Sequence, residues 1–360
     1  MLRITSYTVV ALTLAACAVE ADLETAETSQ AVGAGGGSCP KWGCGENTSE
    51  MGPYKNWWEL QNPQTSVAGA PNSAGMQVLN FQIGLQIYRP EIINGSQLIA
   101  RHPNGGVVSG ANLTNGFFNI STPTGNYRLR IASVNPKATS NVFFWIGPTE
   151  QIETYELMWS GPGGSGRICG NPPAIRSGEG VGKNWNRPYE AVLFTGDRYN
   201  TDSMRVTHTS YTTTQGWFNI GCAGSVLAKL HFNRHTTAGS TFLYGSGLLQ
   251  RQAMLKMYVS DVCGSGNSWT HAGTPLRFQQ VGNWAKLSGS EFAFESQWGS
   301  GGALCMDTHR LGDLYTLEPG DTIYDECPVP ACNGSVGASP MPFMTNAYVV
   351  SAVPVDPNLP

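Results

Sequence analysis

Three side chains in the C-terminal half of the chain are suited to acid–base chemistry: Asp261, His271 and His309. An Asp and a His within hydrogen-bond reach of each other in an open cleft would supply the general base and general acid of a hydrolase. Asp261 can also be structural, because it follows a predicted helix and an acid is disfavoured at the negative end of the helix dipole. That interpretation requires a basic partner such as Lys256 or an arginine, and both interpretations stay open.

Metal-binding and nucleotide-binding patterns are incomplete. His231 and His235 have the spacing with which one helix face binds a metal, but the sequence lacks the Glu of the zinc-protease motif. The loop at 196–202 carries two Asp and one Asn, whereas calcium requires six to eight oxygen ligands, and an Arg lies within the loop. The glycine-rich stretch at 178–183 lacks the first Gly and the final Ser or Thr of a phosphate-binding loop. We therefore expect no metal and no cofactor.

The N-terminal residues have the pattern of an export signal with a lipid anchor. Residues 1–16 combine Arg3 with a short apolar stretch and end in small residues, as in a signal peptide. The sequence Leu14-Ala-Ala-Cys17 resembles the lipobox of bacterial lipoproteins, which predicts lipidation of Cys17 and cleavage before it. Residues 17–38 are acidic and rich in glycine, so we expect a flexible linker. Ala18 stands where a retention signal would have Asp, and we expect an outer-membrane location.

The cysteine count predicts a disulfide framework. Besides Cys17 there are eight cysteines, an even number that favours disulfides in an exported chain. Short separations and the expected helix ends favour the pairs Cys39–Cys44, Cys327–Cys332, Cys169–Cys222 and Cys263–Cys305. Eight cysteines allow 105 pairings, so these four pairs are a hypothesis. The sequence has no CxxC pair to suggest structural zinc, and the even count leaves no free thiol for catalysis.

Most of the elements that would position these residues are predicted to be short strands. In residues 126–134 Tyr127, Leu129 and Ile131 alternate with Arg128 and Arg130, which is typical of a half-buried strand. Similar strands are expected near 77–88, 96–101, 113–121, 141–147, 152–159 and 189–195, separated by Asn-Gly and related turns.

Two helices are predicted further along the chain, at 222–232 and 248–260. In the first helix Leu227 and Leu230 lie on the apolar face, and after the second a glycine such as Gly264 would serve as the stop. We therefore predict a β-rich α+β fold. It has a β-sandwich-like N-terminal part at 39–215, a two-helix plus strands part at 216–332, and a Pro-rich tail at 333–360.

Composition excludes several classes of protein. Only 13% of residues are charged, and the formal net charge is -4, which argues against a coiled coil and against binding to nucleic acid. The chain contains 10 Trp, 13 Tyr and 13 Phe. Such aromatic residues build cores, and in an exported β-rich protein they also build surfaces that bind carbohydrate or peptide.

One stretch of the C-terminal region resembles a known family. Ser260-Asp261-Val262-Cys263 is similar to the Ala-Asp-Tyr-Cys motif of the ADYC-domain family of exported bacterial proteins, with the Ala and the Tyr replaced. Around it, Gly196-Asp-Arg-Tyr199, Gly216-Trp-Phe-Asn219 and Glu295-Ser-Gln-Trp298 also resemble that family. The resemblance extends over roughly 39–332 and implies no particular activity.

Together these features predict a cell-envelope lipoprotein, anchored to a membrane by its lipid and acting as a non-enzymatic binding or structural module. A carbohydrate or a peptide is the expected kind of ligand. The alternative is a secreted hydrolase with acid–base residues near Asp261. The sequence leaves the oligomeric state open.

Overall fold

The computed structural model describes the chain from residue 45 to residue 354, with gaps. The described residues are 45–46, 51, 58–64, 67–138, 152–169, 190–208, 216–222, 225–232, 235–237, 247–270, 275–280, 292–308, 310, 327–332 and 345–354. The predicted signal peptide and linker, together with Cys17, Cys39, Cys44, His271 and His309, lie outside them. In the part that is described, no helix is long and apolar enough to cross a membrane.

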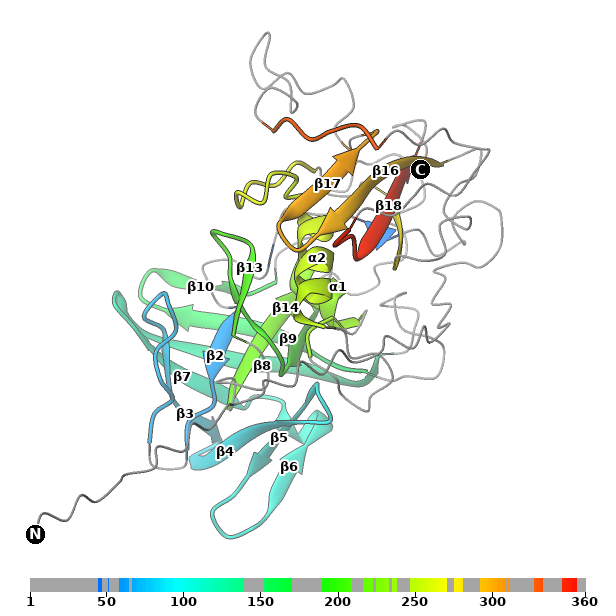
Figure 1. The fold of residues 1–360 in the computed structure, drawn as a ribbon. Coiled ribbons are helices and arrows are strands. Elements are labelled where there is room, and N and C mark those ends of the chain that lie inside the picture. The colour runs from blue at the N-terminus through cyan, green and yellow to red at the C-terminus, as the bar shows by residue number, and fades with distance from the viewer. Residues whose placement is uncertain are drawn as a thin grey trace, which may run out of the picture. The chain divides into compact units, whose positions relative to one another are not determined.

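An antiparallel sheet of 11 strands dominates the described part (Figure 1). Its order is β2 (Glu59–Gln61), β14 (Trp217–Cys222), β11 (Glu190–Phe194), β9 (Ile152–Gly161), β8 (Gly125–Ala138), β7 (Phe117–Thr122), β3 (Gln77–Ile83), β4 (Gln86–Ile93), β5 (Gln97–Arg101) and β6 (Val107–Ser109), and β10 (Gly164–Arg167) pairs with β9. A short 3-10 helix, η2 (Gly110–Leu113), follows β6.

The remaining described strands form two smaller sheets. One has the order β1 (Gly45–Glu46), β15 (Pro275–Gln280), β18 (Val349–Pro354), β16 (Phe292–Gly299) and β17 (Gly302–Met306). The other pairs β12 (Arg198–Asn200) with β13 (Arg205–His208). With two helices among these strands, the chain has the β-rich α+β fold that the sequence predicts. The domain boundaries predicted at 215/216 and 332/333 stay predictions.

The predicted strands occur wherever the chain is described, and the predicted segment at 141–147 lies outside that part. The expected strand at 77–88 is in fact β3 and β4, joined by a turn at Gly84, whose φ of +60° suits glycine. Asn94 and Gly95, both at positive φ, form the tight turn between β4 and β5. On β8, Leu129 is buried and Arg128 is exposed, so the period-two prediction is confirmed.

Strand β4 joins two parts of the large sheet. Its first residues pair with β3 and its later residues pair with β5. β5 in turn contacts β9, and the Leu98 amide donates a 2.8 Å hydrogen bond to the Tyr155 hydroxyl. The apolar side chains between these strands, among them Leu98 and Phe118, form one continuous core.

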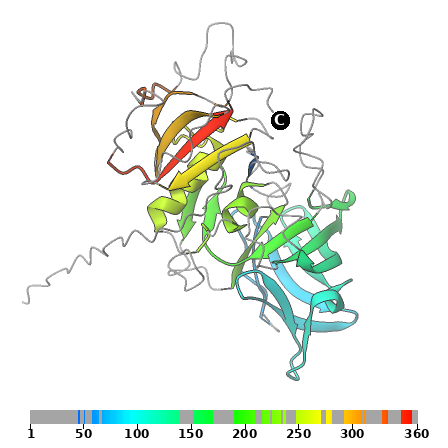
Figure 2. The same cartoon turned by 90° about the vertical axis from the view of Figure 1, so that its right-hand side faces the viewer.

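Two helices that contact each other lie between the large sheet and the five-stranded sheet (Figure 2). α1 (Val226–Phe232) packs on β14 and β11, and Gly221 of β14 allows this, because a Cβ there would lie 2.8 Å from the Ala228 nitrogen. Leu227 and Leu230 of α1 are fully buried, as predicted, although the helix begins four residues later than expected. α2 (Leu248–Val259) packs against β16, β17 and β18.

The end of α2 differs from the prediction. Ser260, and not a glycine, adopts the left-handed conformation that ends the helix, with φ of 54° and ψ of 43°. Its amide donates to the Met257 carbonyl at 3.1 Å. Gly264 also has a positive φ, of 68°, but lies in the turn beyond the helix.

Three disulfides lie among the described residues. Cys169–Cys222 links the end of β10 to β14, and this pairing was predicted. The predicted pairs Cys263–Cys305 and Cys327–Cys332 are wrong, because the structure joins Cys263 to Cys327 and Cys305 to Cys332.

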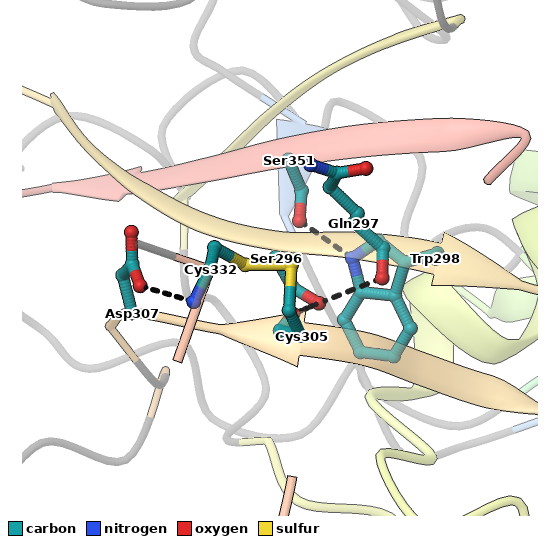
Figure 3. Close-up of a disulfide and its surroundings, with 7 residues drawn as sticks. All are labelled: Ser296, Gln297, Trp298, Cys305, Asp307, Cys332 and Ser351. Carbon is teal, nitrogen blue, oxygen red and sulfur yellow. Dashed lines mark hydrogen bonds between the residues drawn. A yellow bond between two sulfur atoms is a disulfide. The ribbon is translucent and has the colours of Figure 1, made fainter. Parts of the chain in front are cut away.

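The physical reason for this exchange is the course of residues 327–332. This segment runs beside β17: the Met306 amide donates to the Pro330 carbonyl at 2.9 Å, and the Cys332 amide donates to Asp307 Oδ1 at 2.7 Å. Figure 3 shows Cys332 held in this way against Cys305 of β17. Cys327, at the other end of the segment, reaches the turn after α2 instead.

We expect Leu230→Ala to lower the free energy of unfolding by about 2–5 kcal/mol, because the substitution leaves a cavity beneath α1. Denaturant titration followed by tryptophan fluorescence measures the change. The matched control is Leu85→Ala at the fully exposed β3–β4 turn, which should change it by less than about 0.5 kcal/mol. Equal effects at the two positions would contradict the assigned packing.

Candidate functional site

Asp261, the central residue of the ADYC-like motif, is fully buried and forms an ion pair with Lys256. Its Oδ2 accepts hydrogen bonds from the Lys256 ammonium and from the Gly266 amide, the latter at 3.0 Å. Its Oδ1 has no hydrogen-bond partner within the described part of the chain. Lys256 is thus the basic partner that an acid at this end of a helix requires.

Backbone packs directly around this motif. A Cβ on Gly264 would lie 1.7 Å from the Gly301 carbonyl oxygen, and one on Gly302 would lie 2.4 Å from the Val262 oxygen. The Ala303 amide donates to the Val262 carbonyl at 2.9 Å. The start of β17 therefore lies against the residues that follow α2, and a substrate would have to displace main chain to reach Asp261.

Polar side chains of α2 bind the segment that carries β12 and β13. Arg251 forms an ion pair with Asp197. Gln252 Nε2 donates to the Met204 carbonyl at 3.0 Å, and Gln252 Oε1 accepts from the Val206 amide at 2.8 Å. Lys256 Nζ donates to the Ser203 carbonyl at 3.0 Å. All three helix side chains are buried. Burial lowers the pKa of Lys256, and the Asp261 carboxylate opposes part of that shift. The polar side chains of α2 thus hold the backbone around β12 and β13 and the carboxylates of Asp197 and Asp261 in place.

The oxygen-rich loop at 196–202 is used in the same way. The Arg251 guanidinium donates hydrogen bonds to both oxygens of the Asp197 carboxylate, and both side chains are buried. Asn200 Oδ1 accepts hydrogen bonds from the Ser203 amide at 2.8 Å and from its hydroxyl at 2.9 Å. The side-chain oxygens of Asp197 and Asn200 thus already have protein donors, which explains both residues without a calcium ion.

The two histidines with metal-like spacing have separate environments. His231 stacks on Phe194 with 4.4 Å between ring centroids, and its Nδ1 lies 3.2 Å from the Thr236 hydroxyl. His235 is buried, and burial together with the nearby Arg251 guanidinium lowers its pKa from 6.5 to about 3. No group of three potential metal-binding side chains occurs among the described residues.

A second buried polar network, which the sequence analysis missed, lies in the five-stranded sheet. Glu295 of β16 forms an ion pair with Arg310 at 2.5 Å and accepts a 2.6 Å hydrogen bond from the Ser351 hydroxyl. The Trp298 indole donates to Ser351 Oγ at 2.7 Å (Figure 3). A serine beside an acid can suggest a nucleophile. Here Ser351 and Glu295 are fully buried and Arg310 neutralises the acid, so the network joins β16, β18 and residue 310.

The outer side of five strands presents a different kind of surface, which we call the two-row face. Strand register aligns its side chains in two rows across β3, β7, β8, β9 and β10: Gln82, Phe117, Arg130, Met158 and Arg167 in one row, and Asn80, Asn119, Arg128, Ser160 and Ser165 in the other. Arg128, Arg130, Ser160, Ser165 and Arg167 are exposed. Unlike the sites around α2, this face offers polar groups that can reach a ligand.

The sequence could identify only part of this face. Alternation in residues 126–134 placed Arg128 and Arg130 together on the polar side of a strand, but the partners on the other four strands follow from register. Register depends on long-range pairing, which one strand does not encode. His271 and His309, the other catalytic candidates, lie outside the described residues.

We expect removal of one member of the Lys256–Asp261 pair to be strongly destabilising, because the other charge is left buried and unpaired. Asp261→Asn and Lys256→Met should each lower the free energy of unfolding by about 3–5 kcal/mol, and the double variant should lose less than the sum of the two losses. Arg101→Gln is the control, since its ion pair with Glu91 is exposed and should contribute less than about 1 kcal/mol. An Asp261→Asn protein of unchanged stability would contradict a structural role.

Acidification should destabilise the protein through His235. The unfolded chain binds a proton at this residue as the pH falls below about 6.5, whereas the folded chain does not bind it until about pH 3, so stability is complete above pH 6.5 and declines below it. Between pH 7.5 and pH 5 this residue should account for about 2 kcal/mol of lost unfolding free energy. Urea titrations at both pH values should show a smaller loss for His235→Gln, while the exposed-site control His208→Gln should behave as the unaltered protein does.

Comparison with known proteins agrees with the resemblance drawn from the motif. A sequence model of the ADYC domain matches residues 110–312, a narrower stretch than the 39–332 expected from the resemblance. No curated protein and no solved structure matches the chain. The matched stretch contains β7 to β17, both helices and the Asp261 motif, and it makes up more than half of the chain. The chain therefore belongs to the ADYC domain family.

Proposed function

We propose that this protein is a lipid-anchored component of the cell envelope that binds a ligand on the two-row face and does not catalyse a reaction. The observation that carries the proposal is the contrast between its charged groups. The acids and bases around α2 are buried and paired, whereas Arg128 and Arg130 of the two-row face are exposed. An exposed array of charged, amide and hydroxyl groups on a regular sheet is suited to binding rather than to acid–base catalysis.

The anchor is proposed from the N-terminal sequence. Leu14-Ala-Ala-Cys17 has the form of a lipobox, and residues 17–38 would tether the folded part to the acyl chains. The same N-terminal pattern supports an outer-membrane location.

We also propose that the N-terminal strands form a sandwich-like pair of layers. The bend of β4 and the contact of β5 with β9 support this arrangement, because they bring β5 over the inner side of the large sheet. The inner side would then be used for the core, and the outer side of β3 and β7–β10 would be left for a ligand.

A hydrolase centred on Asp261 is the weaker alternative. Asp261 would need to release Lys256, and a histidine would need to approach a carboxylate that β17 encloses. These requirements favour the binding function.

The anchor and the binding face are tested with one unlipidated variant. Cys17→Ser should move the protein from the detergent phase to the aqueous phase in phase partitioning. Purified Cys17→Ser protein should still bind envelopes isolated from source cells that lack the gene. Adding Ser160→Tyr, which places a bulky side chain next to Arg128 in the two-row face, should weaken this binding about tenfold.

The control substitution is His208→Tyr, which adds similar bulk at an exposed position of β13, outside the large sheet. It should leave envelope binding unchanged. Equal binding by the Ser160→Tyr and His208→Tyr proteins would reject the two-row face. Continued detergent partitioning of Cys17→Ser would reject the lipid anchor.

A further inference from the structure

Arg128 and Arg130 are exposed cations without an acidic partner in the described part of the chain. Most other described arginines form ion pairs, namely Arg89, Arg101, Arg167, Arg198, Arg251 and Arg310. Arg128 and Arg130 lie two residues apart on β8, so their side chains emerge on the same side, about 7 Å from each other along the strand. A protein with a net charge of -4 thus presents two uncompensated positive groups side by side.

Neighbouring groups hold both guanidinium groups in place. Arg128 lies over the Phe117 ring, 5.0 Å from its centroid. Arg130 Nη1 donates a 2.9 Å hydrogen bond to Asn115 Oδ1. A guanidinium has five N–H donors, so each arginine keeps donors for a ligand, and the fork geometry suits a carboxylate. Fixing the side chains before binding lowers the entropic cost of binding.

Uncharged polar groups flank Arg128 along its row. Asn80 and Asn119 are joined by a 2.7 Å hydrogen bond in the row of Arg128, which continues through Ser160 to Ser165. Adjacent strands are about 4.8 Å apart, so this row places amides and hydroxyls beside Arg128 on the four other strands of the face. Such groups both donate and accept hydrogen bonds, as the hydroxyls of a sugar chain do.

We infer that the two-row face binds an acidic polysaccharide, with uronate carboxylates paired to Arg128 and Arg130 and sugar hydroxyls bonded to the flanking amides and serines. This inference rests on the binding function proposed above and specifies its ligand. Two arginines match singly charged carboxylates one to one. A phosphate polymer would require a denser array of basic groups, and Arg167, the third arginine of this face, is already paired with Glu156 at 2.8 Å.

The inference is tested with polygalacturonate and with the same polymer after methyl esterification, which removes the charge and keeps the sugar chain. The purified Cys17→Ser protein should bind polygalacturonate, and binding should weaken as sodium chloride is raised. The ester should bind at least about tenfold more weakly, as should polygalacturonate to an Arg128→Gln/Arg130→Gln variant.

Two further variants sharpen the test. Arg101→Gln/Arg205→Gln makes the same change in net charge on strands outside the two-row face and should bind polygalacturonate normally. The Arg128→Lys/Arg130→Lys variant keeps both positive charges but loses the forked N–H donors of the guanidinium groups. Its affinity for polygalacturonate should therefore lie between that of the unaltered face and that of the Arg128→Gln/Arg130→Gln variant.

Three outcomes would overturn the inference. The first is no binding of polygalacturonate, and the second is equal loss of binding in both double Gln variants. The third is equal binding of the acid and its ester; if Ser160→Tyr abolished that binding, the two-row face would remain a binding surface with a different ligand. Binding on the two-row face is rejected by a different result, unchanged envelope binding by the Ser160→Tyr protein, so the two failures are distinguishable.

Discussion

The rest of the fold depends on the buried ion pairs that α2 and the residues around it form. Burying a lone charge costs several kcal/mol, and a partner must offset that cost. Arg251 can be buried only if Asp197 reaches it, and Lys256 only if Asp261 and the Ser203 carbonyl do. Arg310 depends on Glu295 in the same way, and it also donates to the Tyr258 carbonyl of α2 at 3.5 Å. Each charge therefore requires the correct placement of a segment distant in the sequence.

Two disulfides fix the position of segments that lie next to these ion pairs. Cys263 follows the α2 turn that carries Asp261, and its bond to Cys327 brings residues 327–332 to that turn. The bond between Cys305 and Cys332 then fixes the other end of this segment to β17, whose first residues enclose the motif. The closeness of Asp261 and Cys263 in the motif is thus explained by packing: the acid pairs with a buried lysine, and the cysteine fixes the turn through its disulfide.

Sequence patterns predicted those parts of the structure that depend on local chemistry. Alternation identified β8, and Asn-Gly pairs identified turns. Apolar spacing identified both helices, and it placed Leu227 and Leu230 of α1 in the core. The pairing of Cys327 and Cys332 was mispredicted because nearness in sequence was taken for nearness in space, whereas the fold places Cys327 beside Cys263 and Cys332 beside Cys305. The Glu295 network had no pattern to reveal it, because Arg310 and Ser351 come from segments that meet only in the folded sheet.

The distribution of charge also explains why binding is assigned to the outer sheet surface and not to the motif. Few residues of this chain are charged, at 13%, and many of the described ones are committed to ion pairs. Arg198, for example, pairs with Glu59 at 2.5 Å while its guanidinium lies 3.6 Å from the centre of the Trp217 ring. Against this background an exposed arginine without an acid partner is unusual, and two of them share one side of β8. Neither forms an ion pair within the described part of the chain, so both charges remain available to a ligand.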